Sequence, residues 1–254
     1  MVEPGDLHAS TPLEGDPRSN APLSEILGRF TTHEQVNDLL VTCRRCPRLV
    51  AWREEVARVK RRAFRDWEYW GRPLPGFGDS AARLLIVGLA PAAHGGNRTG
   101  RIFTGDSSGD FLFGALYRAG FANQPVATHR GDGLALYDVY ISAAGRCAPP
   151  DNKPTREELE TCRPYLTTDM RLLHRLQGIV ALGSIGFDAV LTVLRSQGYT
   201  IPRLKFGHGA FYELGQGLPW LLASYHPSQQ NTQTGRLTPA MFDTIWQKAR
   251  EKMV

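Results

Sequence analysis

The chain has 254 residues, of which 42% are hydrophobic and 22% are charged, a balance typical of one globular domain with a full core. No apolar run is long enough to cross a membrane, and residues 1–6 are acidic and proline-containing rather than apolar, unlike a secretory signal. We therefore expect a cytoplasmic protein without a membrane span. The formal net charge of +5 comes mostly from arginine, which is compatible with a polyanionic partner and equally with the composition of a GC-rich genome.

The N-terminal part of the chain combines a polar tail with predicted helices. Residues 1–22 are rich in Pro, Gly, Ser and Asp and lack apolar periodicity, which predicts a disordered tail before a single domain at 23–254. A helix is predicted at 33–43. Another begins near residue 52 and leads into a basic, aromatic stretch that ends at residue 70. Prolines and glycines at 73–78 then predict a loop.

Strands and helices alternate in the rest of the chain. Four short apolar runs predict buried strands, at residues 83–88, 137–143, 178–182 and 219–224. Helices are predicted at 108–119, 155–176, 184–195 and 239–252. This alternation predicts an α/β fold with a mainly parallel four-stranded sheet covered by helices on both faces. Ligands of such folds bind at the carboxyl ends of the strands, so the chemistry is expected there.

Four cysteines have an unusual spacing. Two close pairs are separated by 100 residues: Cys43 and Cys46, then Cys147 and Cys162. Unrelated buried thiols are one interpretation. A thioredoxin-like pair would follow a strand, whereas Cys43 and Cys46 precede the whole sheet, and disulfides are disfavoured in the cytosol. Four thiolates fit either tetrahedral zinc or a [4Fe–4S] cluster. The wide separation slightly favours the cluster.

A glycine-rich segment, residues 88–106, begins where the first predicted strand ends. Its glycines allow backbone N–H groups to approach a ligand closely. It lacks the Gly-Lys-Ser/Thr ending of a phosphate-binding P-loop and lacks a dinucleotide fingerprint. A second motif, His226-Pro-Ser-Gln-Gln-Asn231, also follows a strand, and Pro227 fixes the turn after the histidine. We therefore predict a functional rather than a structural role for His226.

These motifs, together with Arg146-Cys-Ala-Pro-Pro150 and the cysteine spacing, closely resemble the uracil-DNA glycosylase superfamily. The form Gly88-Leu-Ala-Pro-Ala-Ala-His-Gly95 is similar to family 5, the type B enzymes of bacteria and archaea. The resemblance covers about residues 40–250. It implies a three-layer α/β/α sandwich, a [4Fe–4S] cluster on the four cysteines, and monofunctional hydrolysis of the N-glycosidic bond that leaves an abasic site in DNA.

The resemblance also assigns roles to residues of this chain. It places the catalytic carboxylate just ahead of the first strand, at Asp79. Asp106, which closes the glycine-rich segment, is the main rival. His226 is expected to donate a hydrogen bond to the base, and Asn123 to contact the base or the attacking water. The flipped base is expected to bind Gly88, Leu89, Ala90, Pro91 and the stacking ring of Phe103.

The expected partner is single-stranded or double-stranded DNA, bound by a monomer. The expected DNA contacts are Arg98, Gln229, Asn231, Arg236 and Leu237. Among these, Leu237 is expected to fill the emptied base stack and Arg236 to contact a phosphate. Residues 141–144 lack the asparagine with which many relatives read uracil. Hypoxanthine, xanthine and modified pyrimidines are therefore expected as further substrates.

Two other classes of function stay open at this stage. Most relatives carry an acid or amide where this chain has Leu89 and Ala90. This departure leaves room for a nucleic-acid or uracil-nucleotide sensor that binds without turnover. The second alternative is a hydrolase of free nucleotides. Release of free base from uracil-containing DNA in catalytic amounts would distinguish a glycosylase from a sensor. Activity on the mononucleotide with little salt dependence would indicate the nucleotide hydrolase.

Overall fold

The computed structural model describes residues 22–253. The predicted disordered tail, residues 1–22, thus lies outside the described residues except for its last position. No helix within the described part is long and apolar enough to span a membrane.

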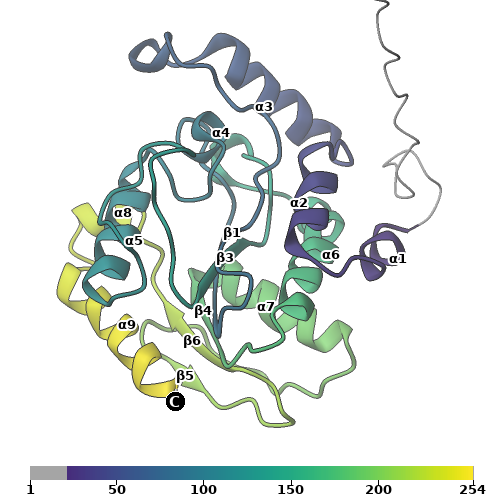
Figure 1. The fold of residues 1–254 in the computed structure, drawn as a ribbon, viewed down its shortest axis with the longest axis vertical. Helices are drawn as coiled ribbons and strands as arrows, with labels where there is room; N and C mark the ends of the chain where they lie inside the picture. The colour runs from purple at the N-terminus through teal and green to yellow at the C-terminus, as the bar shows by residue number, and fades with distance from the viewer. Residues whose placement is uncertain (1–21, 254) are drawn as a thin grey trace, which may run out of the picture.

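A mixed sheet forms the centre of the molecule (Figure 1). Its four inner strands are parallel and buried along their whole length, and they match the four predicted strands. They are β2 (Leu84–Gly88), β3 (Val139–Ala143), β4 (Gly178–Leu182) and β6 (Trp220–Ser224).

The expectation of four strands is corrected to six within the described residues, in the order β1-β3-β2-β4-β6-β5. The additional edge strands, β1 (Phe77–Gly78) and β5 (Phe211–Tyr212), pair antiparallel to β3 and β6. Each has two residues, which is too short to show the period-two alternation by which strands are predicted.

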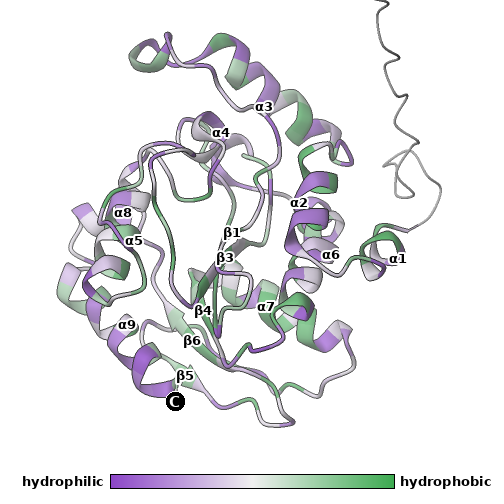
Figure 2. Ribbon diagram, viewed as in Figure 1, coloured by the Kyte–Doolittle hydropathy of each residue, from purple (hydrophilic) through white to green (hydrophobic). Residues whose placement is uncertain are grey.

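Helices cover both faces of the sheet, as the three-layer prediction requires. Side chains at alternate positions of a strand point to opposite faces. Accordingly Leu84 and Ile86 pack with α5 (Ser107–Arg118) and α9 (Pro239–Lys252), whereas Leu85 and Val87 pack with α6 (Arg156–Leu172) and α7 (Ser184–Ser196). In Figure 2 the strands are largely hydrophobic, and the C-terminal part of α9 is largely hydrophilic.

The N-terminal helices form a separate layer beside α6. Helices α1 (Leu23–Gly28) and α2 (His33–Val41) share a small apolar cluster with Tyr165 and Leu172 of α6. Helix α3 spans Pro47–Val59 and is followed by the short helix η1 (Arg62–Phe64). The helix therefore begins before residue 52, because Pro47 suits the first turn. It ends at Lys60, whose φ of 59° is not helical.

Candidate functional site

A pocket of about 270 Å³ lies at the carboxyl ends of β2 and β3. It is lined by Gly88, Leu89, Ala90, Pro91, Ala92, Ile102, Phe103, Asp106, Ser108, Ala143, Asn152, His226 and Ser228. The structure thus brings together the two sequence motifs, which are more than 100 residues apart. They meet because the carboxyl ends of parallel strands share one edge of the sheet.

Phe103 forms one wall of this pocket. Its φ is 53°, an uncommon conformation for a residue with a side chain. The ring lies against Gly88, where an added Cβ would come within 2.9 Å of it, and stacks with the His226 ring at a centroid distance of 5.7 Å. Gly88 is therefore required so that the aromatic ring can sit directly on the end of β2.

Asp106 supplies the carboxylate of the pocket. It is the N-cap of α5, and its Oδ1 accepts a hydrogen bond from the Gly109 N–H at 3.0 Å. The carboxylate also packs against the backbone of Gly95, where any Cβ would overlap with it. Burial raises the pKa of Asp106 above its ordinary value, although hydrogen bonds from the backbone of Gly109 and Ser108 oppose this shift. Such a carboxylate is suited to accept a proton or to face a cation.

Asp79 lies at the opposite edge of the sheet, so the expectation that it reaches the pocket is wrong. Its carboxylate accepts hydrogen bonds from the backbone N–H of Ala81 at 2.8 Å and of Asp138 at 3.2 Å, near the amino ends of β2 and β3. To reach the pocket, residues 76–78 would have to fold back over the site. Instead Phe77 and Gly78 pair with Ile141 and Tyr140 as strand β1. Asp79 therefore stays near the amino ends of the parallel strands.

Asn152, rather than Asn123, is the amide in the pocket. Asn123 is exposed: its Nδ2 donates to the Gly133 carbonyl at 2.8 Å, and its Oδ1 accepts from the Ala135 N–H at 2.8 Å. It therefore closes a surface loop, and its predicted role is corrected. Asn152 ends the short helix η2 (Pro150–Asn152) with a φ of 56° and lines the pocket. Sequence reasoning missed it, although it comes two residues after the Arg146–Pro150 motif.

His226 enters the pocket from the end of β6. Its carbonyl accepts a hydrogen bond from Asn231 Nδ2 at 2.9 Å, which holds the turn before α8 (Gln229–Gln233). Burial lowers the pKa of His226 to about 4. The imidazole is therefore neutral near pH 7, and a neutral imidazole carries one N–H donor and one acceptor nitrogen.

Of the predicted DNA contacts, two are buried, two are exposed and Asn231 is half-buried. Arg98 is 4% exposed and donates to the carbonyls of His94 and Gly105, both at 2.7 Å. Leu237 is 0% exposed and belongs to the core beneath α5 and α9. Neither is free to contact DNA, so both expectations are corrected. Gln229 and Arg236 are exposed, with the Arg236 guanidinium 4.6 Å from the centroid of the Tyr225 ring.

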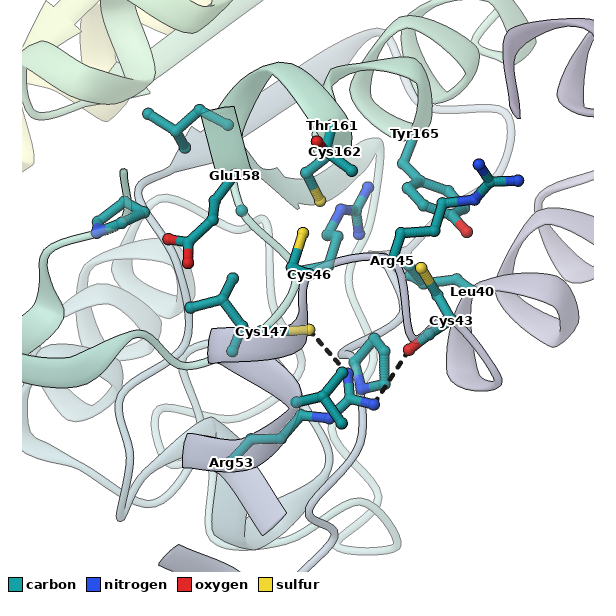
Figure 3. A pocket seen from close by; sticks show the side chains of 17 residues that line it. Leu40, Cys43, Arg45, Cys46, Arg53, Cys147, Glu158, Thr161, Cys162 and Tyr165 are labelled. Atoms are coloured by element: carbon teal, nitrogen blue, oxygen red, sulfur yellow. Dashed lines mark hydrogen bonds between the residues drawn. The ribbon is translucent and has the colours of Figure 1, made fainter. Parts of the chain in front are cut away.

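The four cysteines line a second cavity (Figure 3). They come from four places in the chain: Cys43 after α2, Cys46 at the N-cap of α3, Cys147 after β3 and Cys162 within α6. Arg53 Nη1 donates to the Cys147 sulfur at 2.9 Å, and Nη2 donates to the Cys43 carbonyl at 3.0 Å.

The electrostatics of this cavity disfavour isolated thiolates. Burial, followed by the charges of Cys147 and Cys43, raises the pKa of Cys46 to about 11. Burial also raises the pKa of Cys147 and of Cys162. Within residues 22–253, no three His, Cys, Asp or Glu side chains converge in a way that could hold one metal ion. The arrangement is therefore four thiols around a shared space rather than around one point.

Several known proteins of one superfamily are similar to this chain. The family model of the Uracil DNA glycosylase superfamily matches residues 75–250. A Type-5 uracil-DNA glycosylase of Mycobacterium bovis is 54% identical over 218 residues, which cover 85% of this chain and 80% of that protein. One from Thermus thermophilus is 53% identical over 83% of this chain and 94% of its own length. A Type-4 uracil-DNA glycosylase of Archaeoglobus fulgidus is 30% identical over 61% of this chain and 70% of its own length.

Proposed function

The chain belongs to the uracil-DNA glycosylase superfamily, and we propose that its pocket receives a uracil flipped out of DNA and hydrolyses the bond between the base and deoxyribose. The observation that carries this proposal is the meeting of Asp106, Asn152, His226 and Phe103 around one pocket. A base inside a duplex is out of reach, so the nucleotide must leave the stack, which takes a few kcal/mol.

The side chains divide the reaction between the base and the sugar. The C1′–N1 bond breaks towards the base, so the sugar becomes positive and the base negative. Phe103 stacks on the base, and the neutral imidazole of His226 donates a hydrogen bond to the base oxygen that gains charge. Donors aimed at developing negative charge are effective in a site that excludes water.

Asp106 acts on the sugar side. Its carboxylate is ionised during the reaction, stabilises the positive sugar and accepts a proton from the water that bonds to C1′. The released base takes up a proton, so a free base and an abasic site are formed. Asn152 holds either the base edge or this water, because its amide can both donate and accept. This assignment replaces Asp79 and Asn123, which lie outside the pocket.

We propose that Cys43, Cys46, Cys147 and Cys162 hold a [4Fe–4S] cluster. Two observations support the fit: an all-thiol donor set is the usual one for such clusters, and all four cysteines line one cavity. When bound, the cluster supplies a crosslink between the N-terminal helices and the β3–α6 region. No cysteine lines the pocket among the described residues, which favours a structural role.

Three finer points are also part of the proposal. The Leu89–Ala90 wall is apolar and has no side-chain donor or acceptor, which supports looser base choice, including hypoxanthine, xanthine and modified pyrimidines. The proposed enzyme acts as a monomer. The exposed Gln229 and Arg236, together with the half-buried Asn231, remain proposed contacts to single-stranded or double-stranded DNA.

A base-release assay tests this function. Substoichiometric protein is incubated with defined DNA that contains one uracil, hypoxanthine or xanthine, and with deoxyuridine monophosphate. We expect many turnovers on uracil DNA, persistence in EDTA, and little release from the mononucleotide. Binding without release would instead indicate a sensor, and preference for the mononucleotide would indicate a nucleotide hydrolase.

Iron and sulfide analysis of anaerobically prepared protein tests the cluster, and stoichiometric zinc would contradict it.

A further inference from the structure

The chain between α3 and the sheet forms a basic arm, defined here as residues 60–72. It turns at the top of the molecule above α4 (Gly96–Thr99) in Figure 1. Its five basic residues outnumber two acidic ones, Asp66 and Glu68. The exposed cations are Arg61, Arg62, Arg65 and Arg72.

These four arginines contrast with several others on the surface. Arg44, Arg118 and Arg156 each form an ion pair with an acid. None of the four exposed arginines of the arm forms an ion pair with any residue in the described range 22–253. An unpaired arginine presents all its donors to solvent and is suited to bind phosphate.

The arm is fixed to the loop that forms the pocket. The buried guanidinium of Arg98 lies 3.9 Å from the centroid of the Phe64 ring and 4.2 Å from that of Trp67. The same guanidinium donates to the carbonyls of His94 and Gly105. These two residues lie near the two ends of the segment that joins pocket residues Ala92 and Asp106.

A second contact ties the arm to the same loop. The Tyr69 hydroxyl is 3.1 Å from Nδ1 of His94, and the Arg61 N–H donates to the Tyr69 hydroxyl at 3.4 Å. The arm is therefore held against the glycine-rich segment, whose residues Ala92 and Asp106 line the pocket, and little conformational entropy is lost when its cations meet a ligand.

We propose that the basic arm binds the phosphate backbone of the DNA strand that carries the flipped nucleotide. This inference rests on the proposed function, because a nucleotide in the pocket brings its neighbouring phosphates to the rim. A DNA strand carries one negative charge per 3.4 Å of helix axis, so several phosphates fall within reach of such an arm. The arm acts on affinity and not on the bond-breaking step.

Salt-dependent binding tests the arm. The variant Arg61→Ala/Arg62→Ala/Arg65→Ala is compared with Arg29→Ala/Arg175→Ala/Lys252→Ala, which loses the same charge from exposed positions outside the arm. Affinity for a duplex with a non-hydrolysable abasic analogue is measured by fluorescence anisotropy between about 50 and 200 mM salt. Each lost phosphate contact lowers the slope of log K against log salt by about 0.9. We expect the magnitude of this slope to fall by about 2–3 in the arm variant. In the control variant it should change by less than about 0.5.

Further variants and a stability measurement complete the test. Asp66→Asn/Glu68→Gln removes the two acids of the arm and should tighten binding at low salt. Thermal melting checks that each variant is folded. If the triple variant does not fold, Arg62→Ala alone should lower the slope by about 1. Unchanged slopes in the folded arm variants, or equal loss in the control, would overturn the proposal. Single-turnover base release at saturating protein should stay near the wild-type rate, whereas failure of the proposed function would abolish release in the wild type as well.

Discussion

The two ends of the parallel strands carry similar polar residues and use them differently. At the amino ends, Asp79 and Asp138 accept hydrogen bonds from backbone N–H groups, and Asp138 also pairs with Arg83 at 2.6 Å. At the carboxyl ends, Asp106 and His226 surround a pocket, and burial shifts the pKa of both towards the neutral form.

This difference shows what marks a reactive group. Asp106 also accepts a backbone hydrogen bond as the N-cap of α5, so hydrogen bonding alone does not separate these acids. Asp79 and Asp138 hold the strand ends and do not line the pocket. At the carboxyl ends, the His226 imidazole makes no hydrogen bond to another side chain in residues 22–253, and the Asp106 carboxylate is desolvated. A desolvated group with a shifted pKa beside a pocket is a candidate for chemistry.

The strongest test of this contrast exchanges the two aspartates for asparagine one at a time. Asp106→Asn removes the charge that faces the sugar cation, so the single-turnover rate of uracil release should fall roughly 1,000-fold. Asp79→Asn should stay within about twofold of wild type, since its contacts are local. Quenched-flow or gel-based cleavage at saturating protein measures both. If Asp79→Asn were inactive and Asp106→Asn active, the catalytic carboxylate would be Asp79.

His226 should have the next largest effect. His226→Ala removes one donor to the departing base, and the single-turnover rate should fall roughly 100-fold, while affinity for DNA with an abasic analogue changes little. The matched control is His174→Ala, an exposed histidine that lies between α6 and β4 at the amino edge. Equal effects of the two variants would contradict a specific role of the pocket histidine.

The pH profile should separate the two pocket groups. The pKa of Asp106 is raised by burial, so its active carboxylate is lost as the pH falls through that raised value. Below it the rate should drop about tenfold per pH unit. Because the pKa of His226 is lowered to about 4, its neutral form persists above that value, and His226 should add no second limb between about pH 5 and 8. The acidic limb should be absent from Asp106→Asn, and its persistence there would assign it to another group.

The smallest effect is expected for Asp138, near the amino ends of the parallel strands. Asp138→Ala removes hydrogen bonds to the Arg83 N–H and guanidinium, both at 2.7 Å. Since this pair is partly exposed, the free energy of unfolding should fall by about 1 kcal/mol, with no change in the rate of base release. Urea denaturation measures the stability, and a loss of catalysis without a loss of stability would contradict the distinction between the two edges.

The sequence alone determined the features that depend on local pattern. Four continuous apolar runs predicted the four buried parallel strands, because a strand covered on both faces has apolar residues at every position. The glycine-rich segment and His226 follow two of these strands, so their meeting at one edge was also predictable. The cysteine set followed from residue type and spacing.

Only the tertiary structure decided which side chains face the pocket. Asp79 and Asp106 flank the same strand in sequence, and their roles separate because residues 77–78 pair with β3 while the glycine-rich segment curls back over the strand end. Leu237 and Arg98 resemble exposed loop residues in sequence, yet one enters the core and the other is buried beneath two aromatic rings. Burial of this kind depends on contacts between residues far apart in the chain, and these contacts leave no local periodic signal.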